Sequence, residues 1–291
     1  MNEMLSSFID YLYEEKNLSE NTLMSYRRDL KQYEEYVLKN GIDYLTVKKD
    51  DLNEYLSYLK ELGKAPSTVS RNVASLKAFY GFLYDESVID TNPSEGIRYN
   101  KNVRKIPGVL TGREIDKLFS QPDITTFKGL RDKAMLEVLY ATGIRVSELI
   151  SLKNKDINIK VGYISCSGNG TKRVIPLHDE AIDILKLYIK RHKNMFTEEG
   201  FIFVNVNGQP ITRQGFWKVI KEYVKAARIK KEITPNTLRH SFAAHLIQNG
   251  ADLKSIQQML GHKDISTTQI YNNFTNSRIT QIYKNAHPKA R

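Results

Sequence analysis

The sequence predicts a mainly α-helical protein with two domains, the second of which also contains a small β-sheet. Its length of 291 residues suits about two domains. Apolar residues recur every three or four positions through most of the chain, which is the spacing of amphipathic helices. The stretch 91–108 lacks this spacing and carries two Pro, two Gly and four basic residues, a composition typical of a linker. We therefore expect domains at 1–95 and 109–291, joined by a basic linker at 96–108.

The first 95 residues show four apolar stripes at helical spacing. They lie at 8–12, 23–37, 52–59 and 69–83. Gly63 ends the third stripe, and Pro66 and Ser67 form a favourable helix start before the fourth. These signals predict a four-helix domain.

The second part of the chain begins with a capping-box pattern, Thr111 with Glu114, which predicts the start of a helix. Helical spacing predicts further helices at 130–141, 146–152, 179–193, 212–228, 237–248, 252–260 and 266–273. Strand-like runs occur at 162–165, 173–177 and 201–204. The turn signal Gly168-Asn-Gly170 lies between the first two runs, so we expect them to form a hairpin.

The charge is distributed unevenly between the two parts. The chain has 44 Lys and Arg against 33 Asp and Glu, a net charge of +11. Residues 1–95 hold 11 basic and 17 acidic residues, a net of −6, and residues 96–291 hold 33 and 16, a net of +17. A polyanion would therefore be attracted mostly by the second part. Lysines that are simply solvated around a stable domain are the alternative.

Composition excludes several classes of protein. The apolar runs are too short to span a membrane, and Met1–Asp10 lacks the design of a signal peptide. The single cysteine, Cys166, excludes a disulfide framework and a cysteine-based metal cluster. We expect a protein of the reducing cytoplasm that has no contact with membranes.

Three segments of the second part place charged or polar residues in apolar, tightly turning surroundings. They are Ala141-Thr-Gly-Ile-Arg-Val-Ser-Glu-Leu149, Thr237-Leu-Arg-His-Ser-Phe-Ala-Ala-His245 and Leu260-Gly-His-Lys-Asp-Ile-Ser-Thr-Thr-Gln-Ile-Tyr271. A buried arginine such as Arg239 needs an anionic partner, and a phosphate matches the guanidinium fork. Simpler interpretations exist for each residue: Arg145 could pair with Glu148, and His262 could cap a helix end.

Together the three segments closely resemble the tyrosine recombinases, specifically the Xer-type enzymes related to the integrase of phage lambda. The resemblance runs over nearly the whole chain and rests above all on Thr142-Gly-Ile-Arg-Val-Ser-Glu-Leu149 and on Leu-Gly-His262 followed nine residues later by Tyr271. The segments Ser67-Thr-Val-Ser-Arg71, Ile106-Pro-Gly-Val-Leu-Thr111 and His287-Pro-Lys-Ala-Arg291 also match. It implies a SAM-like DNA-binding domain at 1–95 and a catalytic domain at 109–291.

The resemblance also implies a mechanism of site-specific recombination. Tyr271 would attack a DNA phosphodiester and form a 3′-phosphotyrosine link. Arg145 and Arg239 would bind the non-bridging oxygens and stabilise the transition state. His262 would hydrogen-bond the same phosphate, and Glu148 would help to hold the site. Because arginines neutralise the charge, neither a cofactor nor a metal ion is implied.

Two positions depart from the family pattern. Asn236 stands where the family usually has a histidine, and Asn169 stands where a hairpin lysine commonly acts as general acid. Lys172 could replace that lysine if the hairpin register shifts. Losing one proton-transfer group typically lowers a rate by about 10²–10⁴. We therefore consider an active recombinase in chromosome dimer resolution and cell division, a mobile-element integrase, a DNA-binding relative with weak or absent cleavage, and a basic protein of unrelated function.

The implied partner is double-stranded DNA, bound by a homo- or hetero-tetramer on paired sites; a second recombinase or a regulatory protein would be further partners. Arg71, Lys77 and Arg213 are candidate DNA contacts. Apolar residues at helical spacing in the tail, such as Ile282 and Tyr283, suit docking into a neighbouring protomer. Packing of the tail on its own domain is the alternative.

Overall fold

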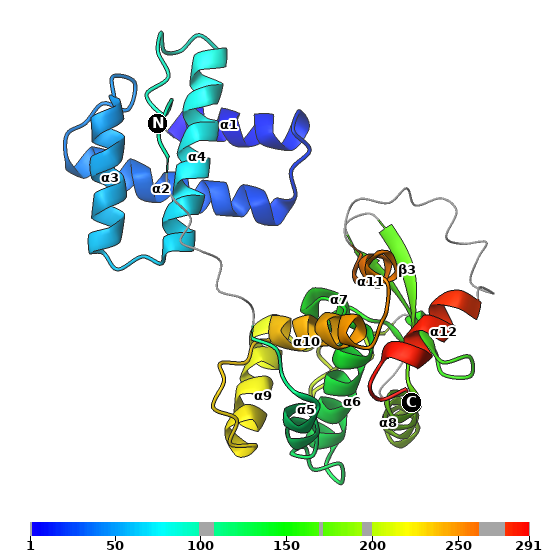
Figure 1. Ribbon diagram of the computed structural model, residues 1–291. Coiled ribbons are helices and arrows are strands. Elements are labelled where there is room, and N and C mark those ends of the chain that lie inside the picture. Colours follow the sequence, from blue (N-terminus) through cyan, green and yellow to red (C-terminus); the bar gives the residue numbers. More distant parts are fainter. Residues whose placement is uncertain (1, 99–107, 169–170, 194–199, 262–276, 291) are drawn as a thin grey trace. The chain divides into compact units, whose positions relative to one another are not determined.

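The computed structural model describes residues 2–98, 108–168, 171–193, 200–261 and 277–290 (Figure 1). The chain divides into two compact units, Met1–Lys105 and Ile106–Arg291, each with its own hydrophobic core. The predicted fold class is confirmed, because the units are mostly helical and the sheet lies in the second. The predicted linker overlaps residues outside those described, so the limits 1–95 and 109–291 stay predictions. Among the described residues, no helix is long and apolar enough to cross a membrane.

The described residues of the first unit form four helices, as predicted. They are α1 (Asn2–Glu14), α2 (Glu20–Lys39), α3 (Lys49–Glu61) and α4 (Pro66–Asp85). Pro66 occupies the first turn of α4, where its missing N–H would have no partner within the helix. The apolar stripes meet in a core rich in aromatic rings: Phe8 packs edge-on against Phe79, and the hydroxyl groups of Tyr33 and Tyr80 are 2.6 Å apart.

The second unit is built around α6, which is buried on nearly all sides. In the part of this unit that the structure describes, the helices are α5 (Gly112–Phe119), α6 (Phe127–Thr142), α7 (Val146–Ile150), α8 (Asp179–Arg191), α9 (Arg213–Ala226), α10 (Pro235–Gln248), α11 (Leu253–Leu260) and α12 (Ser277–Ala286). Of the 16 residues of α6, 13 are buried. Helices α8 and α10 pack against it. The capping box of Thr111 and Glu114 opens α5 as predicted.

The sheet has three antiparallel strands in the order β1-β2-β3. They are β1 (Ile157–Asn158), β2 (Tyr163–Gly168) and β3 (Thr171–Pro176). The predicted hairpin is confirmed as β2 and β3, with Cys166 opposite Arg173. β1 was not predicted, because two residues are too few to show an alternation. The strand expected at 201–204 is wrong: only isolated bridges at Phe201 and Val204 occur there. The helix expected at 266–273 lies outside the described residues.

The described part of the C-terminal tail packs on its own unit. Helix α12 contacts α10, and Tyr283 and His287 are buried. The His287 ring stacks on the rings of Tyr283 and His178, with centroids 4.8 Å and 4.9 Å away. The ammonium group of Lys289 lies 3.0 Å from Glu137 Oε1 and 2.9 Å from Glu180 Oε2. Docking of the tail into a partner stays a prediction.

Candidate active site

Arg145 is placed by a tight turn between α6 and α7. Gly143 ends α6 in the left-handed conformation, with φ of 60°, and a Cβ at this position would collide with the ring of Phe242. The turn makes Arg145 the N-cap residue of α7. Its side chain is 34% exposed. The guanidinium group is therefore accessible to a ligand, while the turn fixes the backbone of Arg145.

Arg239 reaches the same place from α10. The helix begins with a capping box between Thr234 and Thr237 and with Pro235 in its first turn. Arg239 is 8% exposed, and its guanidinium donates hydrogen bonds to the carbonyl oxygens of Gly143 and of Leu260, the latter at 2.9 Å. Both bonds fix the plane of the guanidinium group.

Burial and neighbouring charge make Arg239 receptive to an anion. Burial, followed by the positive charge of Arg145, lowers the pKa of Arg239 to about 10. The group is still protonated at neutral pH, so its cation is held in an environment that disfavours positive charge. An anion bound between Arg239 and Arg145 would offset that cost.

Glu148 connects the site to the sheet. Its carboxylate is 5% exposed and accepts a 2.7 Å hydrogen bond from the backbone N–H of Arg145. It also accepts two parallel bonds of 2.9 Å and 2.8 Å from Arg173 of β3. Burial opposes the charge on Glu148, but these bonds outweigh it and hold its pKa below the usual value. The simpler interpretation of Arg145 is therefore correct in part, since Arg145 Nη1 lies 3.4 Å from Glu148 Oε1.

Arg173 of β3 also belongs to the site but was not predicted from the sequence. Strand alternation could have identified this residue. Arg173 and Ile175 are two positions apart in β3, so their side chains face the same side, and the side chain of Ile175 is fully buried. Arg173 Nε donates to the carbonyl oxygen of Met259 at 2.8 Å, and a Cβ on Gly261 would lie 2.9 Å from the Arg173 guanidinium carbon. Arg173 thus links Glu148 to the end of α11.

Two predicted catalytic residues follow α11 in the sequence. Gly261 ends α11 with φ of 66°, and its carbonyl oxygen accepts a 3.4 Å hydrogen bond from Arg145 Nη2. His262 follows at once in the sequence. His262 and Tyr271 lie outside the described residues, so their places beside the arginines stay predictions.

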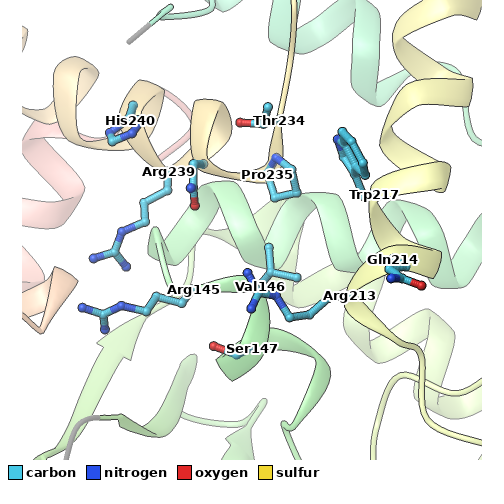
Figure 2. Close-up of a pocket in the computed structure, with 11 residues that line it drawn as sticks. Arg145, Val146, Ser147, Arg213, Gln214, Trp217, Thr234, Pro235, Arg239 and His240 are labelled. Atoms are coloured by element: carbon cyan, nitrogen blue, oxygen red, sulfur yellow. The ribbon is translucent and has the colours of Figure 1, made fainter. Parts of the chain in front are cut away.

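A pocket of about 890 Å³ opens at this site. Its lining includes Arg145, Arg213, Trp217, Asn236, Arg239 and His240. Figure 2 shows the guanidinium groups of Arg145 and Arg239 pointing the same way from α7 and α10. Burial, with the charge of Arg239, lowers the pKa of His240, so His240 is neutral at pH 7. The lining is therefore strongly cationic through arginines.

Of the two positions that depart from the family pattern, Asn169 and Asn236, the structure describes only Asn236. Asn236 is exposed in the first turn of α10 and lines the pocket, whereas Asn169 lies outside the described residues. Lys172 is exposed, and its neighbour Arg173 is buried against Glu148. Since adjacent strand residues face opposite sides, the Lys172 side chain points to the face of the sheet opposite Glu148. Its role as general acid stays a prediction that requires the hairpin to reorient.

The candidate DNA contacts of the first unit both lie on α4. Lys77 is exposed. One edge of the Arg71 guanidinium group forms an ion pair with the buried carboxylate of Asp29. Arg213, the third candidate, is the first residue of α9 and lines the pocket of the second unit. Contacts of all three with DNA stay predictions.

One group of side chains in the described residues has the composition of a metal site. The potential ligand atoms of Glu137, His178 and Glu180 lie within 4.8 Å of one another. However, Lys133 and Lys289 already place ammonium groups 3.0 Å from Glu137. His178 Nδ1 accepts the N–H of Ala181, so the proton of the neutral ring sits on Nε2, the atom that would have to bind the metal. These residues therefore fit an ion-pair cluster better than a metal ion.

Comparison with known proteins agrees with this geometry. Residues 108–283 match the phage integrase family, and residues 5–87 match its N-terminal SAM-like domain. The chain therefore belongs to the phage integrase family. It is 42% identical to tyrosine recombinase XerD of Listeria monocytogenes over 100% of both chains, and 43% identical to tyrosine recombinase XerD of Oceanobacillus iheyensis over 98% of both. Such relatives confirm the resemblance to Xer-type tyrosine recombinases.

Solved structures share the fold at lower identity. The integrase of transposon Tn1549 in complex with circular intermediate DNA has a TM-score of 0.75 at 23% identity, over 90% of this chain and 92% of that chain. The XerH recombinase bound to its difH substrate has a TM-score of 0.70 at 21% identity, over 96% and 81%.

Proposed function

We propose that the chain cuts and rejoins DNA at specific sites, with Tyr271 as nucleophile and with Arg145 and Arg239 binding the scissile phosphate. The observation that carries this proposal is the pair of guanidinium groups that line one pocket from α7 and α10. The Arg239 guanidinium donates to two backbone carbonyl oxygens. The Arg145 guanidinium donates to the carbonyl oxygen of Gly261 and to Glu148. Fixed donors of this kind stabilise charge that develops on the phosphate oxygens.

The reaction balances without a cofactor. The Tyr271 hydroxyl group loses its proton as its oxygen bonds to phosphorus, the bond from phosphorus to the 5′-oxygen breaks, and that oxygen takes up a proton and leaves as a 5′-hydroxyl group. A 5′-hydroxyl group of another strand then attacks the phosphotyrosine and releases Tyr271. The phosphodiester energy is kept in the covalent link. Glu148, positioned by Arg173, acts by holding Arg145 rather than by touching the phosphate.

The site lacks an obvious donor for the proton that the leaving 5′-oxygen needs, among the residues that the structure describes. Asn236 lines the pocket where the family usually has a histidine, and an amide cannot exchange a proton near pH 7. This observation favours a second candidate function, a DNA-binding relative that cleaves slowly or depends on an active partner. Lys172 would supply the proton in the first case.

The test uses a duplex selected for binding to the full chain from random sequence. Each duplex in a panel carries a nick at a different position. Cleavage close to the nick releases a short oligonucleotide that diffuses away, so the strand cannot be rejoined and the covalent intermediate accumulates. An adduct that disappears in Tyr271→Phe supports the enzyme. Specific binding without any adduct, together with an adduct in the double variant Asn169→Lys, Asn236→His, supports the second candidate. No adduct in either protein refutes cleavage at this site.

We also propose double-stranded DNA as the partner and assembly of several protomers on paired sites. The charge of residues 96–291 supports attraction to phosphates. Proteins of similar fold have been solved with DNA, the Tn1549 integrase with circular intermediate DNA and lambda integrase as a dimer on a core site. We further propose a role in chromosome dimer resolution in the cytoplasm, which the resemblance to Xer-type tyrosine recombinases implies. The test is recombination between two directly repeated copies of the selected site on one plasmid, which would release a smaller circle.

A further inference from the structure

We propose that Arg71 contacts a guanine base of the target DNA, and that Asp29 is the positioning residue that fixes the guanidinium group for this contact. The inference rests on the proposed function, because it assumes a specific DNA site.

The pair joins α2 to α4 through a bidentate ion pair. Arg71 Nε donates to Asp29 Oδ2 and Arg71 Nη2 donates to Oδ1, both at 2.8 Å. Two parallel bonds fix both the position and the plane of a guanidinium group. The Asp29 side chain is 2% exposed, whereas the Arg71 side chain is 44% exposed. The carboxylate is thus an internal anchor and the arginine extends from it toward solvent.

The anchor cannot move with the arginine, because other side chains hold the same carboxylate. Asn72 Nδ2 donates to Oδ1 at 3.2 Å, and Ser75 Oγ donates to Oδ2 at 3.0 Å. The amide of Asn72 is itself oriented by the hydroxyl group of Tyr55, which donates to Asn72 Oδ1 at 3.1 Å. Asn72, Ser75 and Tyr55 are all buried. A network of this kind is rigid when every member is satisfied.

This arrangement leaves one edge of Arg71 available. A guanidinium group has five N–H donors, and Asp29 takes the Nε–H and one N–H of Nη2. In the part of the chain that the structure describes, Asp29 is the only acceptor of this side chain. The outer edge therefore presents two parallel donors, one on Nη1 and one on Nη2. A shallow pocket lined by Thr22, Ser25 and Ala74 lies beside it, so a ligand can approach.

The chemistry of this edge favours a guanine over a phosphate. Two parallel donors match O6 and N7 of guanine, which are paired acceptors in the major groove, and that groove admits an α-helix. The adjacent carboxylate cancels the charge of Arg71 and would repel a phosphate at short range. Guanine carries no net charge, so it gains the hydrogen bonds without that repulsion. The pair thus provides discrimination between bases with little general attraction to DNA.

The experiment selects binding sites for the full chain from a library of random duplexes, in parallel for the unaltered protein and three variants. Arg71→Lys keeps the charge and the pairing with Asp29 but has no pair of parallel donors. Asp29→Asn weakens the anchor. Arg28→Ala, an exposed residue of α2, removes one positive charge as a comparator. Affinities are then measured for the selected duplex and for the same duplex with each G·C pair replaced by A·T. Thermal unfolding confirms that each variant is folded.

The expected result is a G·C pair whose replacement weakens the unaltered protein about fivefold or more, as a bidentate base contact requires. This preference disappears in Arg71→Lys, decreases in Asp29→Asn and persists in Arg28→Ala, which binds all sequences more weakly by one common factor. An unchanged motif in folded Arg71→Lys would overturn the inference while leaving site-specific binding intact. A uniform loss across sequences would identify a phosphate contact and also overturn it. If the unaltered protein selects no motif, the proposed site-specific function fails as well.

Discussion

Replacing Arg173 by Met should destabilise the second unit strongly, because the change leaves Glu148 buried without its main partner. The Arg173 side chain is 7% exposed and Glu148 is 5% exposed. Removing one member of a buried ion pair costs about 3–5 kcal/mol. Glu148 keeps the Arg145 backbone N–H at 2.7 Å and Arg145 Nη1 at 3.4 Å, which argues for the lower end, about 3 kcal/mol. With a urea m-value of about 2 kcal/mol/M, the unfolding midpoint falls by about 1.5 M.

The fluorescence of Trp217 measures this loss selectively. It is the one tryptophan of the sequence and lies in α9 of the second unit, so urea titrations report that unit. Lys172→Met is the matched control, since it removes the same charge from the exposed neighbour on β3. It should change stability by no more than about 0.5 kcal/mol.

The pH dependence gives a second, independent check. In the unaltered protein the pKa of Glu148 is lowered, so its stabilising effect is complete above the ordinary carboxyl pKa and is lost as pH falls through the lowered value. In Arg173→Met, burial acts without the guanidinium and should raise that pKa above its ordinary value. The folded variant then binds the proton first, and its deficit shrinks as pH falls from 7 to about 4.5. A midpoint shift no larger than that of Lys172→Met, or a deficit independent of pH, would refute this reasoning.

Three further predictions concern other parts of the chain. Gly143→Ala should lower the urea midpoint of the second unit more than Gly208→Ala, because both have positive φ but only Gly143 has Phe242 within collision distance; equal effects would contradict this. Burial lowers the pKa of His287 to about 4, so the folded tail excludes a proton that the unfolded chain binds, and its stability should be lost as pH falls from about 6.5 to 4. Limited proteolysis of the tail checks this, and His287→Phe should show a weaker pH dependence. A fragment of residues 106–291 should keep most of the nonspecific DNA affinity in anisotropy titrations at several salt concentrations; equal binding by residues 1–95 would disprove it.

Local signals in the sequence were enough for most of the described helices and for the two arginines that line the pocket. The stripes that predicted α2 and α4 arise because each helix must bury one face, and the capping box at Thr111 is read within four residues. Arg145 and Arg239 were found because arginine in apolar surroundings is costly without an anion. Their shared pocket follows from the fold.

Contacts between distant segments could not be predicted in the same way. Arg173 and Glu148 are 25 residues apart, and their meeting depends on how the β2–β3 hairpin packs against α7. Asp29 and Arg71 are 42 residues apart and meet only because α2 crosses α4. The strand predicted at 201–204 was wrong for a related reason. A short buried apolar run does not distinguish a paired strand from an extended segment with isolated bridges. In each case the deciding partner lies elsewhere in the chain.

The charge asymmetry suggests how the two units would divide the work of binding DNA. Attraction to phosphates grows with the number of unpaired basic side chains and weakens steeply with salt, so the net charge of +17 in residues 96–291 would set affinity. Residues 1–95 carry −6 and would contribute little to that term. An arginine whose charge is cancelled by a buried carboxylate can still discriminate bases, since hydrogen bonds to base edges do not depend on net charge. An acidic domain is therefore compatible with sequence recognition, and the contribution of Arg71 to specificity should persist at salt concentrations that remove most nonspecific binding.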